Sequence, residues 1–128
     1  MEEGAIVNVY VAAPLCSEAQ GETAKRGGEA GELRVRVVCL PATEAKGRLD
    51  LAQLGANARR AVQDSSTVGY IGEPTRSATR FSEPILETAE IPQLPGSDGA
   101  AAMTKLLDAL ESADTSSSLR ESIDESFG

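Results

Sequence analysis

The sequence predicts an α/β fold, a three-layer α/β/α sandwich built on a four-stranded parallel sheet. Three observations predict it. Short apolar runs alternate along the chain with segments of helical spacing, which is typical of parallel α/β domains. The first of these runs is almost continuously apolar, as is a strand covered on both faces. Two other runs, over residues 33–40 and 91–94, carry the features of edge strands. Right-handed crossovers then place the strands, numbered along the chain, in the order 2-1-3-4.

The first half of the chain supplies two strands and two helices. We expect the first strand over residues 6–12 and the second over 33–40, where alternating arginines favour an edge position. Between these strands, a capping box that opens at Ser17 predicts a weak helix with little apolar surface. Asp50 is in position to cap a further helix over residues 51–63.

The second half begins with a buried strand over residues 68–71, followed by a helix that Ser77 leads. Pro84 should kink this helix or restrict it to a first turn before the proline. The last strand spans residues 91–94, and Pro92 places it at the other edge because proline cannot donate to a sheet. The inward side of the helix is expected to carry Ala78, Phe81, Ile85 and Ala89.

Two amphipathic helices are expected to end the chain, one capped by Asp98 and one by Ser118. We interpret residues 1–128 as a single domain, with the sheet and crossovers in 1–95 and a helical tail in 96–128. The tail either covers a bare face of the sheet or docks on a partner. The apolar positions are Met103, Leu106, Leu107 and Leu110 in the first helix, and Leu119, Ile123 and Phe127 in the second.

Composition excludes several functions. The formal charge is −8, with 20 acidic and 12 basic side chains, and this field repels the phosphates of nucleic acids. No apolar run approaches the roughly 20 residues of a membrane span. The chain has no histidine, the commonest general base and metal ligand. The glycines of residues 27–31 precede a strand, which is the wrong context for a dinucleotide fingerprint. We therefore expect no enzyme activity, metal or cofactor.

The two cysteines, Cys16 and Cys39, follow or end the first two strands. In the predicted order these strands are parallel neighbours, so both sulfurs lie at the carboxyl edge of the sheet. Neighbouring strands lie about 4.8 Å apart, and a disulfide needs Cα atoms about 5.5–6 Å apart. The spacing favours a disulfide, and two buried free thiols are the alternative.

Four segments carry a resemblance to a known family. They read Ala-Asn-Ala-Arg-Arg-Ala at 56–61, Gly-Tyr-Ile-Gly at 69–72, Ser-Ala-Thr-Arg at 77–80 and Glu-Pro-Ile-Leu-Glu-Thr-Ala at 83–89. Together they resemble the first lobe of type 1 periplasmic solute-binding proteins, the branched-chain amino-acid kind. The resemblance covers most of the first 95 residues, and the family's hinge and second lobe have no counterpart in it.

The resemblance implies a ligand site after the third strand. In the family, a small-hydroxyl cluster there and a loop after the fourth strand hold the ligand. Carried over, these positions are Ser77, Ala78 and Thr79, with Gly72 and Ser97 in the adjoining loops. The pocket would lie at the carboxyl edge, where the strand order reverses. The alternative is that Ser77 is only an N-cap and Thr79 a first-turn residue.

The resemblance also implies a function. We expect a single lobe that binds a small amino acid or similar carboxylate weakly and serves an ABC permease. It would be extracytoplasmic, as a periplasmic protein or a cell-surface lipoprotein with its signal removed, since the acidic start at Met1 is unlike a signal. The alternative is a protein-interaction or dimerisation module without a small-molecule ligand. In either case we expect a homodimer.

Overall fold

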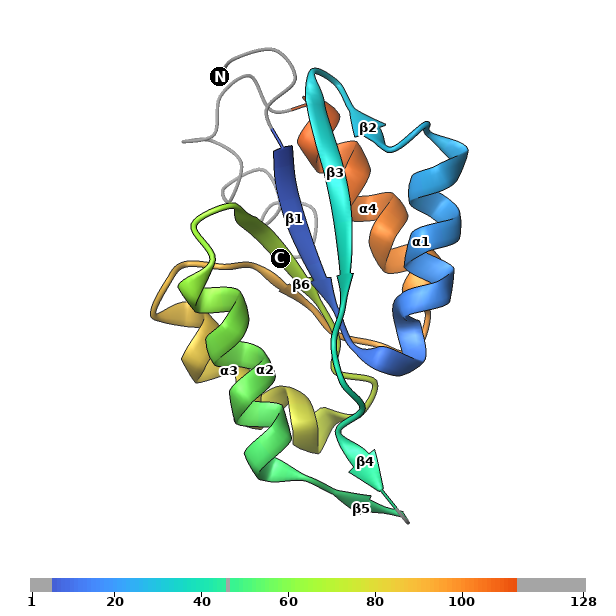
Figure 1. Cartoon of the computed structure of the whole chain (residues 1–128). Helices are drawn as coiled ribbons and strands as arrows, with labels where there is room; N and C mark the ends of the chain where they lie inside the picture. The colour runs from blue at the N-terminus through green and yellow to red at the C-terminus, as the bar shows by residue number, and fades with distance from the viewer. Residues whose placement is uncertain (1–5, 46, 113–128) are drawn as a thin grey trace.

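The computed structural model describes residues 6–45 and 47–112, and it has the three-layer α/β arrangement that the sequence predicts (Figure 1). Two helices cover each face of a central mixed sheet. The sheet has the strand order β2-β3-β1-β6-β7. Its strands are β1 (Ile6–Val11), β2 (Glu29–Ala30), β3 (Leu33–Cys39), β6 (Thr67–Ile71) and β7 (Gln93–Leu94).

The predicted four-stranded parallel sheet is matched only in part. The pairs β3–β1, β1–β6 and β6–β7 are parallel, but β2 adds a fifth strand that is antiparallel to β3. Gly31, with φ +61°, allows the tight turn that returns the chain from β2 to β3. A second two-stranded sheet, β4 (Glu44–Ala45) with β5 (Arg48–Leu49), lies where the sequence predicted a loop.

One face of the sheet is covered by α1 (Cys16–Lys25) and α4 (Gly99–Ser112). Its core is aliphatic, and Met103, Leu106 and Leu107 are fully buried, as predicted for the first tail helix. The predicted cap is also confirmed, because the Asp98 carboxylate accepts a hydrogen bond from the Ala101 amide at 3.0 Å. The second predicted tail helix, opened by Ser118, lies outside the described residues.

The start of α1 differs from the prediction. A 3₁₀ turn, η1 (Ala13–Leu15), leads directly into a helix that begins at Cys16, with no side-chain cap. The capping box predicted from Ser17 to Gln20 does not form. Gln20 donates to the sulfur of Cys39 at 3.4 Å.

The other face is covered by α2 (Leu51–Gln63) and α3 (Arg76–Glu87). Asp50 caps α2 as predicted, accepting from the Gln53 amide at 3.1 Å. The core here is smaller and includes two tyrosines, Tyr10 and Tyr70. The other members of this core are Leu40, Ala58, Ala61, Leu86 and Ile91.

The inward side of α3 was predicted wrongly at two positions. Phe81 is 39% exposed, and Ala89 is exposed beyond the helix end. Thr75 is the N-cap, and the buried positions are Ala78, Ser82 and Leu86, four residues apart. Of the two effects expected of Pro84, restriction of the helix to a first turn is wrong, because α3 continues through Pro84 to Glu87.

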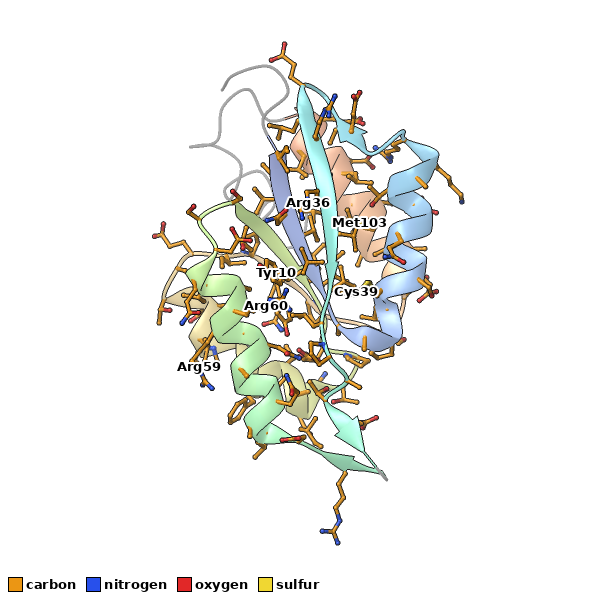
Figure 2. All side chains as sticks on the ribbon, in the orientation of Figure 1. Tyr10, Arg36, Cys39, Arg59, Arg60 and Met103 are labelled. Atoms are coloured by element: carbon orange, nitrogen blue, oxygen red, sulfur yellow. A yellow bond between two sulfur atoms is a disulfide. The ribbon has the colours of Figure 1, made fainter. Side chains whose placement is uncertain are left out.

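The predicted disulfide between Cys16 and Cys39 is confirmed, with its Cα atoms 5.6 Å apart. It joins the start of α1 to the end of β3 at the carboxyl edge of the sheet (Figure 2). Among the described helices, none combines the length and apolar character of a membrane span.

Candidate functional site

Two loops meet at the carboxyl edge of the sheet, where the sequence predicted a ligand site. One joins β6 to α3 and the other follows β7. The Gly72 amide donates to the Leu94 carbonyl at 2.9 Å, and the Gly96 amide donates to the Glu73 carbonyl at 3.2 Å. These two bonds hold the loops together beside the amino terminus of α3.

Two cavities adjoin at this edge and share Thr79 and Pro95 in their walls. We call the larger the loop cavity, of about 310 Å³, which is also lined by Glu73 and Arg76. We call the smaller the helix cavity, of about 220 Å³, whose other lining residues include Glu83, Glu87 and Gln93. They lie at the carboxyl edge of the sheet, beside the end of β6 and the start of α3, where parallel α/β proteins bind ligands. The predicted point between β1 and β6, where the strand order reverses, is not part of either cavity, because no residue of the turn after β1 lines them.

Glu73 is the buried acid of the site. It is 1% exposed, and its Oε2 accepts a hydrogen bond from the Tyr70 hydroxyl at 2.7 Å. Its other oxygen, Oε1, is buried and has no hydrogen-bond partner among the described residues. Burial raises the pKa of the Glu73 carboxyl, and the hydrogen bond from Tyr70 opposes that rise in part. Burial, with the adjacent Glu73 carboxyl, also raises the pKa of Tyr70.

Thr79 connects the loop to the helix. Its hydroxyl lies 3.0 Å from the Thr75 carbonyl and 3.3 Å from the Glu73 carbonyl, and it accepts from the Glu73 amide at 3.3 Å. The Thr79 hydroxyl is thus within hydrogen-bond distance of both the amide and the carbonyl of Glu73, and these contacts hold the loop against the first turn of α3.

Gln93 closes the helix cavity from the β7 side. Its amide nitrogen donates to the Gly72 carbonyl at 2.8 Å and to the Ser82 hydroxyl at 2.7 Å. The Gly72 carbonyl can only accept, so the amide orientation is fixed. The amide oxygen, Oε1, is consequently left buried without a partner among the described residues.

The structure brings together only part of the predicted ligand set. Thr79 lines both cavities, and Gly72 is buried next to Glu73. Ala78 is buried under the helix start, and its amide lies 3.4 Å from the Thr75 hydroxyl. Ser77 and Ser97 are exposed and stand outside the lining of both cavities. The alternative role of Ser77 as N-cap is wrong, because Thr75 holds that position.

The sequence prediction missed the two residues with free acceptors, Glu73 and Gln93. A signal for Glu73 was present, since it is an ionisable residue two positions after a buried strand. Gln93 gave no comparable signal, because its role depends on the pairing of β6 with β7.

A second polar cluster surrounds Asp64, between α2 and β6. Asp64 accepts from the Asn8 amide at 2.7 Å, the Tyr10 hydroxyl at 2.8 Å and the Ser66 backbone amide at 2.9 Å. These bonds, that of Asn8 first, lower the pKa of the Asp64 carboxyl. The Arg60 guanidinium lies 5.7 Å from the centre of the Tyr10 ring, between α2 and the sheet (Figure 2). The carboxylate is well supplied with donors, so we interpret this cluster as structural.

In the described part of the chain, no group of three or more cysteine, aspartate or glutamate side chains could hold a metal ion. Comparison with protein-family models found no match to this chain. Searches of curated proteins and of solved structures also found none.

Proposed function

We propose that this chain is a single-lobe solute-binding domain that takes a small amino acid or similar carboxylate at the carboxyl edge of its sheet. The observation that supports it best is the pair of adjoining cavities around Thr79, at the position that the resemblance implies. A concave site with a few convergent polar groups is the usual form of a small-molecule site.

The start of α3 suits a carboxylate. The first amides of a helix have no intrahelical partner, and the helix dipole favours an anion there. Arg76 is the first residue of α3 and lines the loop cavity. An arginine can bind both oxygens of a carboxylate at once. The carboxylate of a ligand would therefore lie between the Arg76 guanidinium and the first turn of α3.

Such binding is expected to be weak. One lobe leaves its ligand partly in water, and each wet hydrogen bond contributes only about 1 kcal/mol. Three or four such contacts correspond to a dissociation constant near millimolar. An ABC permease and an extracytoplasmic location belong to the same proposal. The Cys16–Cys39 disulfide supports that location, because disulfides persist mainly in oxidising compartments.

The test is isothermal titration of the disulfide-intact protein with leucine and valine. We expect binding near millimolar for the unaltered chain, weakened about tenfold by Arg76→Gln. Arg34→Gln is the matched control, because Arg34 is exposed near the start of β3 and its loss changes the net charge equally. Equal loss in both variants would indicate a non-specific charge effect and contradict the proposed site.

A second function, a protein-interaction or dimerisation module, is favoured by exposed apolar side chains. Leu51 at the start of α2 is 50% exposed, and Phe81 on α3 is 39% exposed. Both helices cover the same face of the sheet. Light scattering tests this function. A dimer at moderate concentration that Phe81→Ser dissociates would support it, and a monomer at millimolar concentration would refute it.

A further inference from the structure

We propose that the paired cavities require an ammonium group on their ligand, with Glu73 as its acceptor. This inference rests on the proposed function and deepens it, because a simple carboxylate would lack the group that the site needs. The ligand class is then a small aliphatic amine, either an amino acid or a diamine, rather than a carboxylic acid alone.

The first argument is the kind of polar atom that the site leaves free. The described residues contain three buried side-chain atoms without a hydrogen-bond partner, and two of them belong to this site. These are Oε1 of Glu73, beside the loop cavity, and Oε1 of Gln93, beside the helix cavity. Buried polar groups are nearly always paired in folded proteins. The Gln93 oxygen accepts hydrogen bonds, and so does the Glu73 oxygen when its carboxyl is ionised. The partner of the ionised site must therefore be a donor, which a ligand carboxylate is not.

The second argument is the sign of the charges. Glu83 and Glu87 line the helix cavity, and its lining contains no arginine or lysine. Arg76 is the one basic residue among the residues that line the loop cavity. With a formal charge of −8 on the whole chain, the local field around the cavities favours a cation. The two cavities thus offer an anion position near Arg76 and cation positions beside Glu73 in the loop cavity and beside Glu83 and Gln93 in the helix cavity.

The third argument is the environment of Glu73. Its carboxyl meets Tyr70 from β6, its backbone meets Thr79 from α3 and Gly96 after β7, and Arg76 shares its cavity. A buried carboxyl is costly to ionise unless a cation pairs with it, and burial raises its pKa here. An ammonium group would supply both the charge and the missing donor. Affinity for an amine should accordingly increase as the pH rises through the pKa of Glu73.

The experiment compares three ligands on the disulfide-intact full chain by isothermal titration. They are putrescine, which has two ammonium groups, leucine, which has one with a carboxylate, and butyrate, which has a carboxylate alone. We expect putrescine and leucine to bind at least tenfold more tightly than butyrate. Glu73→Gln should weaken putrescine at least tenfold, because an amide carries no charge and its oxygen is a weaker partner for ammonium.

The matched control is Glu32→Gln, which removes the same charge at the exposed turn before β3, at the opposite edge of the sheet. It should leave putrescine affinity within twofold. Thermal unfolding of both variants checks that each folds. Butyrate that binds as tightly as putrescine, with Glu73→Gln unchanged, would overturn the ammonium requirement and leave the proposed function standing. No binding of any of the three ligands would overturn both.

Discussion

The two faces of the sheet are built differently. On the α1/α4 face the core is aliphatic, and the two helices are joined at their surface by polar contacts. Arg26 forms ion pairs with Asp108 at 2.8 Å and Glu111 at 3.2 Å, and the Glu22 carboxylate accepts from the Thr104 hydroxyl at 3.1 Å. On the α2/α3 face the core is smaller and encloses polar side chains. These include Tyr70, Glu73, Ser82 and Asn57, each at most 2% exposed.

This difference places an apolar face that stabilises the fold opposite the face that we propose for ligand binding. Apolar burial is the main source of folding free energy, and the α1/α4 face has most of it. On the α2/α3 face, polar side chains occupy part of the interior. Two of them, Glu73 and Gln93, each have a buried acceptor atom without a hydrogen-bond partner among the described residues. Natural proteins break packing rules mainly at functional sites. The less regular face is therefore where we expect ligand chemistry.

The largest expected effect is a truncation on the α1/α4 face. Leu106 is fully buried, and its side chain packs so closely on β6 that a Cβ added at Gly69 would lie 2.9 Å from it. We expect Leu106→Ala to lower the free energy of unfolding by about 4 kcal/mol and Leu86→Ala, on the other face, by about 2 kcal/mol. Urea unfolding measures both. A larger loss at Leu86 would reverse the ranking of the two faces.

The second-largest expected effect on stability is loss of the disulfide. It closes a loop with a sequence separation of 23 residues, for which loop entropy gives about 3.5 kcal/mol. We expect the double variant Cys16→Ala, Cys39→Ala to lose about that much stability in urea unfolding. Reductant should destabilise the unaltered chain similarly and leave the double variant unchanged. A chain that is indifferent to reductant, with both thiols open to alkylation, would contradict the bridge.

The third prediction concerns Glu73, whose ionisation should lower the stability of the fold as the pH rises. Its folded pKa lies above the ordinary value of 4.5, so the folded protein holds this proton more tightly than the unfolded chain does. That contribution is complete below pH 4.5 and is lost as the pH rises through the folded pKa. We expect Glu73→Gln to raise the melting temperature by a few degrees at pH 7 and to bring no gain at pH 4. A gain of equal size at both pH values would exclude titration of Glu73 as its cause.

Asp64 should show the opposite and smallest effect. Its hydrogen bonds lower its pKa below 3.8, so its contribution is present above that value and is lost as the pH falls through the folded pKa. Because Asp64 is only partly buried, we expect Asp64→Asn to cost roughly 0.5–1 kcal/mol at pH 7 and less at pH 3. Urea unfolding at the two pH values measures this difference, and a constant loss would contradict it.

The predictions from sequence succeeded where one periodic pattern decides the outcome. The apolar runs located β1, β3 and β6, and the spacing of Met103 with Leu106 and Leu107 located α4. Parallel adjacency of the first two strands placed the cysteines within reach of a disulfide, and the structure joins them. Such patterns act over a few residues or between neighbouring strands, so sequence alone expresses them.

The predictions failed where distant segments compete for one side chain. Gln20 was expected to close a capping box and instead reaches Cys39 on another strand. Thr75 rather than Ser77 caps α3, and Ser82 rather than Phe81 lies on the buried side of this helix. The free acceptor of Gln93 is apparent only once β7 lies beside β6. Hydrogen-bond accounting of this kind needs the tertiary fold.

The two outermost strands of the sheet, β2 and β7, have two residues each. Long, flat edge strands are templates onto which another chain can add, and this is how sheets grow into fibrils. On one margin β2 pairs only with Leu33 and Arg34, so the rest of β3 forms the edge there and carries the exposed charge of Arg36. The other margin is flanked by Pro92 and Pro95, which have no amide to donate. Charge on the first margin and proline on the second make each a poor template for pairing with another chain. We therefore expect the chain to resist fibril growth even when the α2/α3 face is partly unfolded, because this resistance depends on the edges of the sheet and not on its core.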